Sequence, residues 1–133
     1  MDTFKNKTAL LVDDDLDILS MVSSLLKEMG FTVVTAEGQK EAEKYLDNNK
    51  PDIAIFDLTM ENGDSGFILC YKTKKKYPAT YTMLLTSVTA DTGMQFGLVT
   101  DDDRGWIRAD SYIEKGFRPE QIQMEIERLF TGK

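Results

Sequence analysis

Short apolar runs alternate along the chain with longer segments in which apolar residues recur every three or four positions. Apolar runs rich in β-branched residues are typical of buried strands, and the three-and-four spacing is typical of one face of a helix. The pattern predicts five strands, at residues 10–12, 31–35, 52–58, 81–86 and 111–114.

Helical segments are predicted between these strands and after the last one. The first carries apolar residues from 18 to 29 and ends at Gly30, the second spans residues 38–48, and the third spans residues 67–76 before Pro78. The last helix opens at Pro119, and residues 89–110 are expected to form a short or broken helix and a long loop. Because strand and helix alternate, we predict an α/β fold in which a five-stranded parallel sheet carries helices on both faces.

Composition narrows the class of protein. The 133 residues are enough for one domain, which we expect to span residues 1–133, and 41% apolar content favours a globular fold over disorder. The single cysteine, Cys70, cannot form an internal disulfide, so we expect a reducing compartment, the cytoplasm. No apolar run approaches the roughly 20 residues of a membrane span, and we expect no secretory signal peptide.

Charge and residue types exclude further classes. The net charge of -7 disfavours direct binding to nucleic acid, which requires clustered cations. The chain has no histidine, which excludes histidine-ligated zinc sites and histidine-based catalytic triads. Any chemistry must therefore use carboxylates, hydroxyl groups and lysine.

Polar residues stand at the ends of four predicted strands: Asp13 and Asp14, then Asp57, Thr86 and Lys115. The carboxyl ends of parallel strands meet at one edge of a sheet, where ligands bind. Carboxylates gathered there repel one another, so the pocket should either hold a proton or recruit a cation, and a hard divalent cation such as Mg²⁺ relieves that repulsion. A carboxylate beside a cation and a lysine is also a competent nucleophile toward a phosphoryl group. The spacing therefore suggests an aspartyl-phosphate site.

These residues stand in four motifs that together resemble the receiver domain of two-component response regulators. The motifs are Val12-Asp13-Asp14-Asp15, Ile55-Phe56-Asp57-Leu58, Leu84-Leu85-Thr86-Ser87 and Tyr112-Ile113-Glu114-Lys115. The resemblance covers almost the whole chain, and the combination is specific although each motif alone is weak. It implies a doubly wound, flavodoxin-like sheet with strand order 2-1-3-4-5.

By this resemblance, Asp57 accepts a phosphoryl group. Asp13 and Asp14 bind Mg²⁺ directly or through water, and Asp57 and the backbone carbonyl of Thr59 complete the ligands that the protein supplies. Asp15 is expected to act differently, because an acid that precedes a helix caps its N-terminus and suits its dipole.

The resemblance also implies roles for residues near the ends of the fourth and fifth strands. Lys115 pairs with the acceptor and then with the phosphate, and Thr86 swings inward to donate a hydrogen bond to the phosphate. Tyr112 matches an aromatic residue that rotates with this threonine in relatives. A half-buried tyrosine of the core is an alternative interpretation of nearly equal weight.

The sequence departs from the family pattern in three places. Glu61 stands where relatives usually have proline, and the loop before Gly66 carries one extra residue. Lys115 precedes Gly116 rather than the proline whose cis bond is common in relatives. The segment between Thr86 and Lys115 is longer than usual and rich in glycine. These departures concern the loops around the site and the segment that forms the fourth helix in relatives.

The resemblance implies a signalling module rather than an enzyme. A sensor histidine kinase or phosphotransfer protein would donate the phosphoryl group to Asp57, which would alter affinity for a downstream protein. No direct contact with nucleic acid or membrane is expected, and a weak or phosphorylation-dependent dimer is compatible with this role. The alternatives are a degenerate receiver that binds partners without phosphate and an aspartyl-phosphate phosphatase. The phosphatase would use Asp13 and Asp15 as an Asp-x-Asp pair.

Other features have less specific interpretations. Near the end of the third helix, four lysines either complement the helix dipole on a solvated face or mark an anionic partner: Lys72, Lys74, Lys75 and Lys76. Cys70 is interpreted as a core residue. Residues 101–103 form an acidic turn or an additional cation contact, and Trp106 either packs on the core or offers an exposed anchor.

Overall fold

The structure is a computed structural model, of which we describe residues 4–58, 65–86, 109–114 and 116–131. The strands are β1 (Thr8–Val12), β2 (Thr32–Ala36), β3 (Ile53–Asp57), β4 (Tyr81–Thr86) and β5 (Ser111–Glu114). The helices are α1 (Leu16–Glu28), α2 (Gln39–Asn48), α3 (Ser65–Lys76) and α6 (Pro119–Thr131). In this described part of the chain, no helix is long and apolar enough to cross a membrane.

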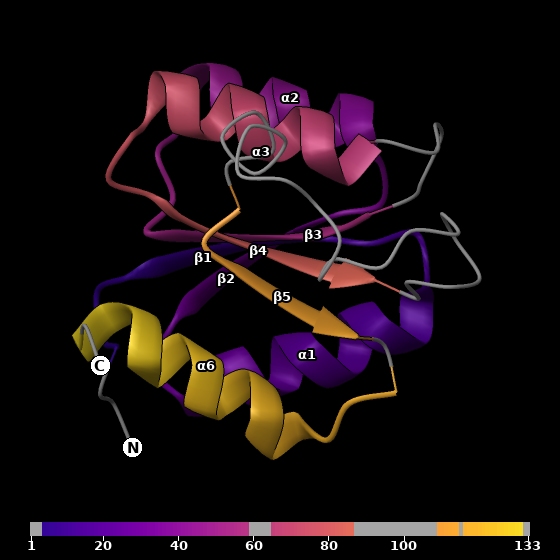
Figure 1. Cartoon of the computed structure of the whole chain (residues 1–133), viewed down its shortest axis with the longest axis vertical. Coiled ribbons are helices and arrows are strands. Elements are labelled where there is room, and N and C mark those ends of the chain that lie inside the picture. Colours follow the sequence, from indigo (N-terminus) through magenta and orange to yellow (C-terminus); the bar gives the residue numbers. More distant parts are fainter. Residues whose placement is uncertain (1–3, 59–64, 87–108, 115, 132–133) are drawn as a thin grey trace, which may run out of the picture.

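The five strands form one parallel sheet in the order β2-β1-β3-β4-β5. Helices α2 and α3 cover one face, and α1 and α6 cover the other (Figure 1). This arrangement confirms the predicted α/β fold and the flavodoxin-like strand order. The irregular helix expected within residues 89–110 falls mostly on residues 89–108, which lie outside the described part.

The hydrophobic core has one part on each face of the sheet. Beneath α1 and α6, the buried residues include Leu11, Val22, Leu26, Ile55 and Ile126. Beneath α2 and α3, they include Leu10, Leu46, Ala54, Phe56 and Cys70. Central strands that are covered on both faces are apolar at consecutive positions, which explains the short apolar runs of β1 and β3. These two strands form a rigid support for the acids at their carboxyl ends.

Helix α3 begins earlier than the sequence pattern predicts. Its first residue is Ser65 rather than Phe67, and Ser65 and Gly66 are both buried. The Gly66 N–H donates to the carbonyl oxygen of Leu58 at 2.7 Å, so the first turn packs on the chain that leaves β3. Glycine is a poor helix former, which is why the pattern places Gly66 in the preceding loop.

Aromatic side chains pack together where the strands begin. Phe4 stacks on Phe31 with 4.7 Å between ring centroids, and the Phe130 ring lies 5.1 Å from Phe4. Tyr81, the first residue of β4, packs edge-on against Phe130 at 4.8 Å. Phe4 precedes β1 and Phe130 lies in the last turn of α6, so this aromatic cluster joins the two ends of the described chain where the strands begin.

The lysines of α3 make contacts within the fold. The Lys72 ammonium pairs with Glu43 of α2 at 2.7 Å, and Lys74 pairs with Asp110, just before β5, at 2.7 Å. Lys72 and Lys74 are thus paired with acids of the same chain, and the interpretation of the lysine run stays a prediction. The buried thiol of Cys70 confirms the prediction of a core residue, and burial raises its pKa.

Candidate functional site

The predicted acidic residues meet at the carboxyl edge of the sheet. β1 leads directly into Asp13 and Asp14, and the neighbouring strand β3 ends on Asp57. One carboxylate oxygen from each of the three residues lies within 4.8 Å of the others. Asp13 and Asp57 are buried, whereas Asp14 is exposed. The structure therefore brings together three of the predicted site residues.

This acidic cluster has the chemistry of a cation site. Carboxylates at such short separations repel strongly, because the protein interior screens charge far less than water does. Hard divalent cations such as Mg²⁺ prefer oxygen ligands, and the cluster offers one oxygen from each of three residues. The exposed Asp14 leaves one side of the cluster open to solvent. The donor set therefore fits a divalent cation.

The carboxylates of Asp13 and Asp15 make different contacts. The Asp15 N–H donates to Oδ1 of Asp13 at 2.9 Å, which helps to orient the Asp13 carboxylate. The Asp15 carboxylate instead accepts from the N–H groups of Asp17 at 2.9 Å and Ile18 at 3.3 Å, so it caps α1 as predicted. Because this carboxylate serves the helix N-terminus, it does not join the acidic cluster, and the arrangement disfavours the phosphatase alternative.

The backbone that follows Asp57 is fixed from two sides. Within the sheet, Asp57 pairs with Leu85 of β4. The next residue, Leu58, donates its N–H to the Leu85 carbonyl at 2.9 Å and accepts at its own carbonyl from the Gly66 N–H. The candidate acceptor therefore lies on a strand end held between β4 and the first turn of α3. The sequence pattern alone gives Gly66 no role in the site.

Thr86 ends β4, next to the strand that carries Asp57. Its side chain is fully buried, and its hydroxyl has no hydrogen-bond partner among the described residues. Burying a hydroxyl without a partner costs free energy, so packing alone would favour valine at this position. The buried hydroxyl is consistent with the predicted role of Thr86 toward a phosphoryl group, which stays a prediction.

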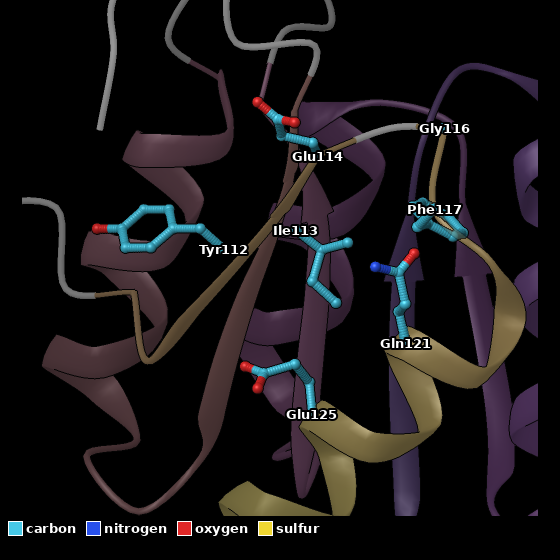
Figure 2. A pocket seen from close by; sticks show the side chains of 7 residues that line it. All are labelled: Tyr112, Ile113, Glu114, Gly116, Phe117, Gln121 and Glu125. Carbon is cyan, nitrogen blue, oxygen red and sulfur yellow. The ribbon is translucent and has the colours of Figure 1, made fainter. Parts of the chain in front are cut away.

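Other predicted site residues are not brought into the acidic cluster by the described part of the chain. Tyr112 packs against the core beneath α2 and α3, and its ring lies on the opposite side of β5 from α6 (Figure 2). This packing fits the core interpretation, and rotation of Tyr112 with Thr86 stays a prediction. Lys115, Thr59 and Glu61 lie outside the described residues, so the roles of Lys115 and Thr59 also stay predictions.

Gly116 occupies the position where relatives commonly have proline. Its φ is 95°, in the region that glycine adopts readily and other residues rarely do. A proline ring holds φ near about -65°, so proline could not follow this backbone path. The described backbone conformation at Gly116 therefore does not suit proline.

A hollow of about 360 Å³, which the sequence did not predict, lies beside β5 and the start of α6 (Figure 2). Its lining residues are Tyr112, Ile113, Glu114, Gly116, Phe117, Gln121 and Glu125. The Ser111 hydroxyl donates to Glu125, and two guanidinium nitrogens of Arg128 donate to the same carboxylate at 2.9 Å each. The Arg128 contact lowers the pKa of Glu125. None of the clustered acids lines this hollow, so it is distinct from the acidic site.

Known proteins of related sequence share this domain. Residues 9–127 match the response regulator receiver domain family. The chain is 34% identical over 116 residues to the regulatory protein VanR of Enterococcus faecium, covering 85% of this chain and 45% of VanR. It is 34% identical over 121 residues to the heme response regulator HssR of Staphylococcus haemolyticus, covering 90% of this chain and 50% of HssR. The chain thus spans about half the length of these relatives.

A solved structure has a similar fold. The response regulator TrrA of Thermotoga maritima, determined in complex with Mg²⁺ and BeF, is 28% identical and has a TM-score of 0.74. The alignment covers 92% of this chain and 98% of that chain. Because the family match covers most of the sequence and the fold agrees with it, this chain belongs to the response regulator receiver domain family of two-component signalling proteins.

Proposed function

We propose that this chain is the phospho-acceptor of a two-component or phosphorelay pathway, with residues 1–133 acting as one receiver domain and Asp57 as the acceptor. The observation that carries the proposal is the gathering of Asp13, Asp14 and Asp57 at the carboxyl edge of the sheet. Such a cluster opposes folding because like charges repel. Cation-dependent phosphoryl transfer gives a functional reason for its presence.

The proposed chemistry uses the acidic cluster directly. Asp13, Asp14, Asp57 and the backbone carbonyl of Thr59 would hold Mg²⁺, which when bound neutralises charge on the transferring phosphoryl oxygens. The Asp57 carboxylate attacks phosphorus, and the bond from phosphorus to the imidazole nitrogen of the donor breaks with its electron pair on that nitrogen. The product is an aspartyl phosphate at Asp57.

Phosphorylation is proposed to select a second conformation. Lys115 pairs with the phosphate, Thr86 donates its hydroxyl hydrogen to a phosphate oxygen, and Tyr112 moves with Thr86. The buried Thr86 hydroxyl supports this proposal, since a hydrogen bond to phosphate would satisfy it. The conformational equilibrium shifts only if these groups bind the phosphate better in the active arrangement than in the resting one.

The proposed partners are proteins. A sensor histidine kinase or phosphotransfer protein supplies the phosphoryl group, and a downstream protein recognises the phosphorylated form. The net charge of -7 disfavours nucleic acid as a direct partner of this domain. The chain is proposed to catalyse only its own phosphorylation and dephosphorylation, without turnover of an external substrate.

The proposal is tested by incubating the protein with acetyl phosphate and Mg²⁺ and measuring its intact mass. We expect a gain of one phosphoryl group that a chelator prevents and that Asp57→Asn removes. Asp14→Ala should weaken Mg²⁺ binding in calorimetry, since it deletes one ligand. Labelling that persists in Asp57→Asn would overturn the assignment of the acceptor.

Two further measurements separate the alternatives. A degenerate receiver would show the same spectrum with and without beryllofluoride and Mg²⁺. The spectrum of the proposed receiver should change when both are added. A phosphatase would release phosphate continuously from a phosphomonoester, whereas the proposed receiver should not.

A further inference from the structure

We propose that Gly66 is a positioning residue for phosphoryl transfer, because the first turn of α3 fixes the backbone of the acceptor Asp57. This inference rests on the proposed function of Asp57. The sequence pattern places Gly66 in a loop, and its contacts in the structure assign it a more specific role.

The closeness of the backbones is the first observation. A Cβ atom added at Gly66 would lie 2.6 Å from the carbonyl oxygen of Asp57, 2.6 Å from Cα of Leu58 and 2.8 Å from Cδ2 of Leu84. Cβ atoms essentially never approach other heavy atoms closer than 3.0 Å. Two of the three contacts are with backbone atoms, which cannot turn aside as the end of a side chain can. Only glycine therefore allows α3 to lie this close to the end of β3.

The backbone conformation does not explain the glycine. Among the described residues, the glycines with positive φ are Gly30 and Gly116, so Gly66 has a backbone that other residues could adopt. Glycine is also the least favourable helix residue apart from proline. A glycine in the first turn of α3 is therefore explained by close approach to the strand rather than by the path of the chain.

Hydrogen bonds join the same two segments. The Gly66 N–H donates to the Leu58 carbonyl at 2.7 Å, and the Leu58 N–H donates to the Leu85 carbonyl of β4 at 2.9 Å. The residue directly after the acceptor is thus bonded to α3 on one side and to β4 on the other. A shift of the first turn of α3 must displace either this residue or the strand end that carries Asp57.

Displacing the first turn of α3 is expected to slow the phosphorylation of Asp57. Moving the added Cβ from 2.6 Å to an ordinary contact of 3.4 Å requires a displacement of about 0.8 Å between α3 and the strand end. Misplacing a reacting group by about 1 Å can cost about a hundredfold in rate. We therefore expect Gly66→Ala to slow phosphorylation of Asp57 by acetyl phosphate at least about tenfold, with saturating Mg²⁺.

A matched control separates this effect from loss of stability. Ile126→Ala removes a fully buried side chain of α6 on the opposite face of the sheet, so it destabilises the fold without adding an atom beside Asp57. Rates are compared at a temperature at which thermal unfolding shows both variants to be folded. The inference is overturned if Gly66→Ala stays within about twofold of the unsubstituted protein, or loses no more rate than Ile126→Ala.

A double variant identifies which contact matters. Leu84→Val removes the side-chain atom nearest to the added Cβ and leaves the two backbone contacts in place. We expect Gly66→Ala/Leu84→Val to remain as slow as Gly66→Ala. Recovery of the rate would show that Gly66 merely accommodates the Leu84 side chain, which contradicts a role in positioning the acceptor.

If Gly66→Ala fails to fold, a measurement on the unsubstituted protein tests whether Gly66 positions the acceptor. The rate of hydrogen exchange at the Gly66 N–H is measured with and without Mg²⁺ and beryllofluoride. The exchange rate of the Leu129 amide in α6 serves as the reference. We expect the Gly66 amide to exchange more slowly when the acceptor is loaded, by about tenfold or more relative to Leu129. Unchanged relative exchange overturns the inference. If the unsubstituted protein takes up no phosphoryl group, the proposed function fails instead.

Discussion

The two ends of the sheet bury very different side chains. Where the strands begin, Phe4, Phe31 and Phe130 lie with ring centroids 4.7 to 6.0 Å apart, and these contacts stabilise the fold. Where the strands end, the buried carboxylates of Asp13 and Asp57 lie in one acidic cluster with Asp14. One end contributes stability, and the other opposes folding by charge repulsion at the proposed phospho-acceptor site.

This difference shows how one small domain can hold an unfavourable site. The central strands β1 and β3 run from one end to the other, and all of their side chains except that of Thr8 are buried. Apolar burial along these strands and aromatic packing at one end offset the charge repulsion at the other. The two ends should therefore respond in opposite directions to substitution.

The largest expected effect on stability comes from substitution at the aromatic end of the sheet, where the strands begin. Phe31→Ala removes a ring that is 4% exposed and should lower the free energy of unfolding by about 3 to 5 kcal/mol. Urea unfolding measures this loss. The folded fraction should still be phosphorylated at close to the normal rate, because Phe31 lies far from the acidic cluster along the sheet. A rate per folded molecule that falls along with the stability would show that the two ends are not independent.

The opposite change is expected at the acidic end. Asp57→Asn removes one of the clustered charges, so in metal-free buffer the free energy of unfolding should rise by about 0.5 to 2 kcal/mol while phosphorylation is lost. Asp47→Asn on the exposed side of α2 is a matched control, and it should change stability by less than about 0.5 kcal/mol. A less stable Asp57→Asn would contradict the view that the cluster opposes folding.

A smaller effect is expected from Thr86. Thr86→Val replaces a buried hydroxyl that has no partner among the described residues, so stability should rise by about 1 kcal/mol. The variant should still accept phosphate at Asp57, but the spectral change on phosphorylation should shrink. Unfolding curves and nuclear magnetic resonance spectra with beryllofluoride report the two properties. A full spectral response in Thr86→Val would remove Thr86 from the proposed switch.

The smallest effect concerns acid pH and Glu125, away from both ends of the sheet. Because Arg128 and Ser111 hold the pKa of Glu125 below its usual range in the folded state, the carboxylate stabilises the fold above the ordinary glutamate pKa of about 4.3. That contribution is lost as the pH falls below this value and through the lower folded pKa. Glu125→Gln should therefore lose less stability than the unsubstituted protein between about pH 5 and pH 3 in unfolding experiments. If the stability of the two proteins fell in parallel as the pH was lowered, the stabilising role of the Glu125 carboxylate would be contradicted.

The sequence predicts the central architecture well for a physical reason. Strands buried on both faces must be apolar at consecutive positions, so β1 and β3 are visible as short apolar runs that end in acids. Asp15 is also predictable, because a carboxylate just before a helix satisfies free N–H groups of its first turn. The α/β class and the strand-end acids follow from such local rules, and the strand order that brings the three acids together is supplied by the family resemblance.

Features that depend on close packing are not predictable in the same way. Gly66 has poor intrinsic helix propensity, and only the approach of α3 to the end of β3 explains its place in the first turn. The hollow beside β5 lies between that strand and the start of α6, and residues from both segments line it. In both cases the cause is contact between segments that propensity and periodicity do not describe.

The most direct measurement of the central claim is chemical trapping of the acceptor. The protein is incubated with acetyl phosphate and Mg²⁺, the acyl phosphate is reduced with borohydride, and the converted residue is located by peptide mass spectrometry. We predict that conversion occurs at Asp57 and disappears when Mg²⁺ is chelated. Conversion at another acid, or at Asp57 to the same extent without Mg²⁺, would contradict the account.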